Sequence, residues 1–205
     1  MSETMVATGS MMDGLTLPML RVRAVSAQTL LLLAAAWVLP AAAHWAGMPG
    51  RVWLPMHWPV IFAGLCYGWR SGALIGLAAP GISFLLSGMP PPVALPAMTA
   101  ELAAYGFLAG LVRGRFHRNL WLSVAAALLG GRLVFLGIRL GTGGIVGSFA
   151  DYLRAAMLPG LPSALAQFVL LPLAAGGWVR RERRHAGAHE GGLREGVDGS
   201  GPGGI

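Results

Sequence analysis

The sequence predicts an all-α membrane protein, a single bundle of six transmembrane helices with both termini in the cytoplasm. Of its 205 residues, 55% are hydrophobic and only 11% are charged, whereas a soluble domain carries about 25% charged residues. Uncharged stretches at 24–50 and 71–100 exceed the roughly 20 apolar residues that cross a bilayer. The arginines collect on one side of the predicted spans, which sets the orientation.

The first predicted span covers residues 27–47 and follows a polar tail at 1–20. The same run has the features of a signal peptide, because Arg21 and Arg23 precede an apolar stretch that ends in small residues near Ala43. We favour a retained helix, since the polar segment before the apolar run is long for a signal peptide and the rest of the chain is itself apolar.

Five more spans complete the predicted bundle over residues 21–180. The second and third, 54–69 and 72–86, form a helical hairpin with a tight turn at residues 70–72. Four prolines make 87–96 a rigid extended loop, because each removes a backbone donor and clashes with the preceding turn. The last three spans are expected at 97–112, 120–140 and 153–179, and the Gly-rich polar residues 181–205 form a disordered cytoplasmic tail.

Arginine placement predicts the orientation of the bundle in the cytoplasmic (inner) membrane. With the N-terminus inside, 11 arginines lie in the cytoplasm, three (Arg51, Arg139 and Arg154) lie at the outer ends of spans, and Arg132 lies within one. The net charge of +7 therefore reflects topology. No aromatic residues interleave with a basic patch, so nucleic acid is not an expected partner.

Several classes of chemistry are excluded or weakly supported. All 15 basic residues are arginine, so the chain has no lysine nucleophile and no Walker-type ATPase site. The single cysteine, Cys66, is expected to be a packing residue. Ser83, Ser87 and Ser163 lack the G-x-S-x-G setting of a nucleophile, and we predict neither an enzyme nor a cofactor.

Three ionisable residues fall in the outward half of the predicted spans: His57, Glu101 and Arg132. Charges inside a span are expensive unless they are paired or face a cavity. Glu101 and Arg132 can form a structural ion pair between neighbouring helices, or they can line an outward-facing pocket in which Arg132 binds a carboxylate or carbonyl group. The sequence leaves both interpretations open.

Weaker candidates surround this pair. His57 has no second metal ligand near it, so no metal site is predicted. Tyr105 follows Glu101 by four residues and shares its helix face, and Gln167 is an amide in the last span. Each either lines the pocket or forms an interhelical hydrogen bond. Glycines four apart, such as Gly72 and Gly76, let helices approach closely.

Four motifs occur in order along the chain: LPMHWPVIFAGLCYGWRSGALIGLAAPGISFLLSGMPPP, MTAELAAYGFLAGLVR, GGRLVF and LPGLPSALAQFVLLP. Together they resemble the substrate-binding S components of energy-coupling factor (ECF) vitamin transporters, over residues 27–180 and closest to the pantothenate and folate branch. The resemblance implies a six-helix fold that binds a vitamin at its outer face, under the loops after the first, third and fifth helices. A separate membrane T component with two ABC-type ATPases would drive transport.

We therefore predict a substrate-binding subunit for a small water-soluble vitamin or a related metabolite, and the arginine favours pantothenate. Glu101 and Arg132 are the expected polar anchors and Met89 the expected lid residue, in a site completed by His57, Tyr105 and Gln167. The T component of such transporters often docks on an A-x-x-x-A face of the first helix, and here the clear instance, Ala42 to Ala46, lies toward the outer end. The alternative is a stand-alone transporter or channel of similar topology.

Overall fold

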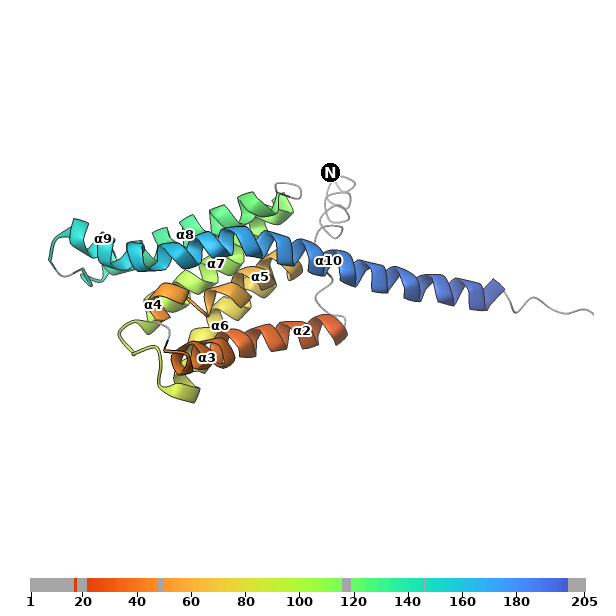
Figure 1. Ribbon diagram of the computed structural model, residues 1–205, viewed down its shortest axis with the longest axis horizontal. Coiled ribbons are helices and arrows are strands. Elements are labelled where there is room, and N and C mark those ends of the chain that lie inside the picture. The colour runs from red at the N-terminus through yellow and green to blue at the C-terminus, as the bar shows by residue number, and fades with distance from the viewer. Residues whose placement is uncertain (1–16, 18–21, 48–49, 116–118, 146, 199–205) are drawn as a thin grey trace, which may run out of the picture.

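The computed structural model describes residues 17, 22–47, 50–115, 119–145 and 147–198, and its elements are helices. Figure 1 shows them side by side along one axis, with α10 running the length of the bundle and projecting beyond it. Within the described residues, five helical segments are long and apolar enough to cross a membrane: Ala24–Trp45, Trp69–Ser87, Leu95–Arg115, Leu120–Gly141 and Phe149–His185. The predicted fold class, an all-α membrane bundle, is confirmed.

The first span is one continuous rod with a wide turn in its middle. It consists of α2 (Val22–Leu33), the π-helical turn η1 (Ala34–Val38) and α3 (Leu39–Trp45). The Leu39 N–H donates to the Ala34 carbonyl, five residues back. This wide turn comes directly before Pro40, which has no N–H to donate to the turn before it. Ala35 and Ala36 are buried there, where η1 packs against α6.

The helix found at the second predicted span, 54–69, is too short to cross a bilayer. After the short α4 (Gly50–Trp53), the chain bends at Leu54, whose φ is +46°, and α5 (His57–Tyr67) has 11 residues. At 1.5 Å per residue α5 is about 16 Å long, against about 30 Å for the bilayer core. Nine of its residues are buried, so α5 is a core helix enclosed by the others.

The hairpin turn between the second and third predicted spans lies at Gly68, and its prediction at residues 70–72 was wrong. Gly68 has a φ of +88° and separates α5 from α6 (Trp69–Ser87). Glycine adopts this backbone conformation without the clash that a Cβ would cause. Arg70, which suggested a span end, belongs instead to the first turn of α6.

The centre of the bundle is held by contacts between backbones. The central helix, α7 (Leu95–Arg115), packs against α5, α6 and α8. A Cβ at Gly64 or at Gly72 would fall on the carbonyl oxygen of Gly106, and one at Gly106 would fall on the carbonyl oxygen of Gly72. These glycines let three helices meet at van der Waals distance, as the sequence predicted.

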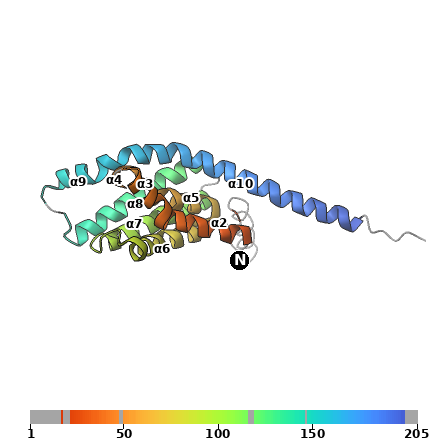
Figure 2. The same ribbon diagram turned by 60° about the horizontal axis from the view of Figure 1, so that its bottom comes forward.

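The remaining elements close the bundle. As the prolines predicted, the segment between Ser87 and Leu95 is not helical, although Pro96 lies in the first turn of α7. α8 (Leu120–Gly141) starts at Asn119, whose Oδ1 accepts from the Leu122 N–H at 3.0 Å. α9 (Phe149–Met157) and the 3-10 turn η2 (Leu158–Gly160) lead into α10 (Leu161–Asp198). Figure 2 again shows α10 lying along the bundle, where it packs on α8 and α5.

The ends of two helices differ from the prediction. α7 runs to Arg115, so Arg113 is buried in its last turn rather than placed in a loop. α10 continues to Asp198, whereas residues 181–205 were predicted to be disordered. The prediction rested on missing apolar periodicity, but no proline interrupts the chain between Pro172 and Pro202, and its arginines, glutamates and alanines favour helix.

Of the predicted polar tail at 1–20, all but Leu17 lies outside the described residues. The Leu17 N–H donates to the Cys66 carbonyl at 2.8 Å, and its side chain is buried. This contact lies at the end of the bundle that carries Arg70, Arg113, Arg115 and Arg180, which we call the arginine-rich end. The opposite end carries α4, α9 and the loop between α6 and α7.

We expect Gly72→Ala to destabilise the protein. Its new methyl group would meet only backbone, the Gly106 carbonyl and the Gly64 Cα at 2.7 Å, and overpacking of this kind costs about 1–3 kcal/mol. Gly81→Ala is the matched control on the same helix, because no atom lies within 4 Å of a Cβ there. Thermal unfolding in detergent measures both variants. Equal melting temperatures would contradict the close backbone contact.

Candidate functional site

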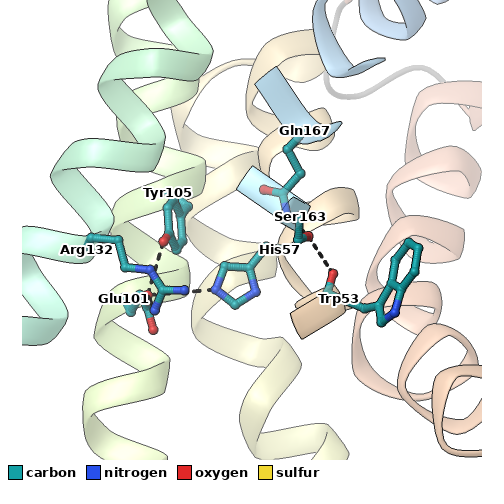
Figure 3. A network of polar contacts seen from close by, with 7 residues as sticks. All are labelled: Trp53, His57, Glu101, Tyr105, Arg132, Ser163 and Gln167. Carbon is teal, nitrogen blue, oxygen red and sulfur yellow. Dashed lines mark hydrogen bonds and ion pairs between the residues drawn. The ribbon is translucent and has the colours of Figure 1, made fainter. Parts of the chain in front are cut away.

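Three side chains, one each from three helices, surround the carboxylate of Glu101. Oε1 of Glu101 accepts from Nη1 of Arg132 at 2.9 Å and from the Tyr105 hydroxyl at 3.1 Å. Nε2 of His57 lies 3.8 Å from the same oxygen. Figure 3 shows the four side chains pointing toward one another from α5, α7 and α8. We call this group the Glu101 cluster.

The local sequence explains how each member reaches the cluster. Glu101 and Tyr105 are one turn apart on α7 and therefore share a face. A Cβ at Gly131 would lie 2.7 Å from the Tyr105 ring, so this glycine makes room for the ring beside Arg132. His57 starts α5 directly after the bend at Leu54, and its N–H donates to the Leu54 carbonyl at 3.0 Å.

Most of the Glu101 cluster is buried. His57, Glu101 and Tyr105 are each at most 3% exposed, whereas the side chain of Arg132 is 22% exposed. The rings of His57 and Tyr105 pack edge to face, with centroids 4.8 Å apart. Arg132 is thus the accessible member, and its charge balances that of the buried carboxylate.

His57 is buried without full hydrogen bonding. Neither of its ring nitrogens has a hydrogen-bond partner among the side chains and backbone that the structure describes, since 3.8 Å to Glu101 is too long for one. A buried polar atom without a partner costs free energy. The imidazole is therefore available to a group that would supply the missing hydrogen bond.

A second polar group lies on α10 and reaches to α4. Nε2 of Gln167 donates to Oγ of Ser163 at 2.9 Å, and that hydroxyl donates to the Trp53 carbonyl at 2.7 Å. Gln167 is fully buried, and its Oε1 accepts no hydrogen bond within the described part of the chain. Figure 3 shows this group beyond His57 from the Glu101 cluster. We call it the Gln167 group.

The structure brings together four of the six predicted site residues. His57, Glu101, Tyr105 and Arg132 form one cluster, and Gln167 belongs to the neighbouring group. Met89 lies in the loop after α6, is 60% exposed, and its N–H donates to Oγ of Ser87 at 3.4 Å. The structure therefore does not place Met89 in the Glu101 cluster.

Sequence reasoning missed two supporting residues. Ser163 was considered only as a nucleophile, although its four-residue spacing from Gln167 indicates a shared helix face. Gly131 was not considered, and only its position directly before Arg132 could have suggested it. In the part of the chain that the structure describes, no three His, Cys, Asp or Glu residues come close enough to hold a metal ion.

The comparison with protein families agrees with this architecture. Residues 27–179 match the sequence model of the family described as ECF transporter, substrate-specific component. The chain belongs to this family. A search of curated proteins and a search of solved structures each found no match.

Membership of the ECF substrate-specific components establishes the general role of the chain. It is a multi-pass membrane protein and the subunit of an ECF transporter that binds the substrate, and such subunits are not enzymes. The matched residues include three of the five spans in full, most of the first and last spans, and every residue of the Glu101 cluster.

We expect Arg132→Met to destabilise the folded chain, because it leaves the buried carboxylate of Glu101 without its cation. Breaking a buried pair in this way costs about 3–5 kcal/mol, and the partial exposure of Arg132 reduces the cost toward the lower figure. Adding Glu101→Gln should restore much of the loss, since the amide oxygen can still accept from Tyr105.

Thermal unfolding in one detergent compares these variants with Arg154→Met. Arg154 forms a comparable ion pair with Asp151 at 3.8 Å, but both side chains are more than 70% exposed, so its loss should cost under about 1 kcal/mol. An Arg132→Met variant as stable as Arg154→Met would show that the Glu101 pair does not contribute to stability.

Proposed function

We propose that the chain captures a small water-soluble vitamin that carries a carboxylate, with pantothenate as the first candidate. The observation that carries this proposal is the partly exposed guanidinium of Arg132 beside buried polar groups that lack partners. The resemblance of the four motifs to the pantothenate and folate branch supports the same choice.

Arg132 can bind an anion while it stays paired with Glu101. A guanidinium has five N–H donors in a fork that fits a carboxylate, and Glu101 accepts from Nη1. The carboxylate of Glu101 holds the fork in place and lowers the cost of burying the arginine. The structural and the ligand-binding roles of this pair are therefore compatible.

His57 and Gln167 would recognise the uncharged part of the substrate. The imidazole of His57 offers one donor and one acceptor, and Oε1 of Gln167 offers an acceptor. Pantothenate carries two hydroxyl groups and an amide besides its carboxylate, so it can supply these missing hydrogen bonds. Tyr105 would act by holding Glu101 and packing against His57.

The loop between α6 and α7 would cover the bound vitamin. Met89 lies in this loop at the end of the bundle opposite the arginine-rich end, and its side chain is exposed. A flexible thioether can pack against ligands of irregular shape. We therefore keep Met89 as a proposed lid residue that reaches the ligand when the loop closes.

In the topology we propose, the chain lies in the cytoplasmic (inner) membrane. The end that carries α4, α9 and the loop between α6 and α7 faces outward, and the arginine-rich end faces the cytoplasm. A T component and two ABC-type ATPases would supply the energy, since the chain has no Walker motif. Capture by the outer loops would be followed by reorientation of the bundle, with the first span as the docking helix.

We expect one vitamin from a panel of B vitamins to raise the melting temperature of the purified chain, with nanomolar affinity by calorimetry. The variant Glu101→Gln/Arg132→Met should stay folded and bind that vitamin about 100-fold more weakly, because the ligand carboxylate then enters an apolar site without its cation. Arg154→Met is the control and should leave the affinity unchanged, because Arg154 is exposed on α9.

Comparison with a ligand analogue tests whether Arg132 binds the carboxylate of the ligand. Pantothenol has a hydroxyl where pantothenate has its carboxylate. If pantothenate is the ligand, the natural chain should prefer it strongly, and the double variant should bind both compounds about equally. Unchanged affinity in the folded double variant would leave Arg132 with a structural role only.

We also expect the chain alone not to accumulate substrate in liposomes. Radiolabelled vitamin should bind to the reconstituted protein without concentrative uptake, because the energy source is a separate set of subunits. Protein-free liposomes and the double variant Glu101→Gln/Arg132→Met are the controls. Accumulation by the chain alone would favour the stand-alone transporter.

A further inference from the structure

The sequence of α10 changes from apolar to strongly basic directly after Val179. Its residues are predominantly apolar up to Val179, and Arg180, Arg181, Arg183 and Arg184 follow directly. Because the apolar part lies in the bilayer core, the arginines begin at the level of the lipid headgroups. Trp178, whose indole N–H donates to the Tyr67 hydroxyl at 3.1 Å, marks the same level.

The two sides of this basic segment face different surroundings. Val179 is buried, Glu182 is half-buried, and the Trp178 indole donates to Tyr67 of α5, so this side of α10 faces the bundle. With 3.6 residues per turn, the residues at 177, 180, 181, 184 and 185 project to the other side. The segment therefore presents a separate basic face away from the bundle.

The basic face borders an open hollow. Gly177, Arg180, Arg181, Arg184 and His185 line a space of about 280 Å³. A Cβ at Gly177 would meet no atom within 4 Å, so this glycine leaves the hollow open. No carboxylate is among the lining residues. None of the side chains that the structure describes forms an ion pair or hydrogen bond with the three arginines.

We propose that this face binds the phosphate group of an anionic phospholipid. Guanidinium groups bind phosphate oxygens in pairs of parallel hydrogen bonds, and each arginine near an anionic membrane surface adds to the attraction. The hollow lies beside the apolar surface of α10, where Leu173 and Ala174 are exposed. A lipid can therefore place its acyl chains along the helix and its phosphate among Arg180, Arg181 and Arg184.

Native mass spectrometry of the full chain in detergent tests the proposal. Dioctanoyl phosphatidylglycerol should bind about tenfold or more tightly than dioctanoyl phosphatidylcholine. Arg181→Gln/Arg184→Gln should remove this preference. Gly177→Leu should also remove it without any change in charge, because the leucine fills the hollow. Melting temperatures in the same detergent show whether each variant is folded. If Gly177→Leu does not fold, the result for Arg181→Gln/Arg184→Gln decides the test.

The matched control is Arg70→Gln/Arg115→Gln, which removes the same charge from exposed positions at the arginine-rich end. It should keep the preference for phosphatidylglycerol within about twofold. Three results would overturn the proposal: no preference in the natural chain, an equal loss in the two double variants, or inorganic phosphate stabilising the chain as strongly as phosphatidylglycerol does.

Discussion

The direct backbone contact of α5, α6 and α7 at Gly64, Gly72 and Gly106 is the constraint on which the rest of the structure depends. α5 is too short to cross a bilayer and has no stable place on a lipid-facing surface, because its N-terminus would leave backbone donors unpaired in hydrocarbon. The glycines allow α5 to lie in the core between longer helices. The depth of α5 in turn sets the level of His57, which starts the helix at the height of Glu101 and Tyr105. A side chain in place of any of the three glycines would move the helices apart and would separate these residues.

Within the described residues, the buried charge of Glu101 is paired, whereas some buried polar atoms beside it lack a hydrogen-bond partner. The single charge of Glu101 has a cation at 2.9 Å and a hydroxyl donor at 3.1 Å, which the cost of burying a charge in a membrane requires. His57 and Gln167, in contrast, keep unpaired polar atoms within the described structure. A purely structural network has no reason to retain such atoms, since an apolar residue of similar size would cost less. This combination of incomplete hydrogen bonding and a complete ion pair supports the proposed site for a ligand that carries an anion and uncharged polar groups.

Hydropathy and the one-turn spacing of Glu101 and Tyr105 were enough to predict the bundle, the long helices and the contact between these two side chains. The pairing of Glu101 with Arg132 followed from the cost of isolated charges in neighbouring spans. The half-length of α5 could not be predicted in the same way, because its sequence is as apolar as that of a complete span and its ends depend on single residues, Leu54 and Gly68. The helix beyond Arg180 was missed for the opposite reason. The sequence after Arg180 shows no apolar periodicity, so its helix had to be predicted from local propensity alone.

α10 carries residues of the proposed ligand site and of the proposed lipid site at opposite ends of the bundle, and their separation follows from its geometry. Gln167 and Arg180 are 13 residues apart in sequence, which is about 20 Å along a helix. Ser163 and Gln167 turn toward α4 and the interior, whereas Arg180, Arg181 and Arg184 turn away from the bundle. A change at one end therefore removes no contact at the other, and effects on ligand binding and on lipid binding can be measured independently in the same chain. Pro172 lies between the two regions and is buried. Since it has no N–H to donate to the preceding turn, it interrupts the backbone hydrogen bonds of α10 between the two regions.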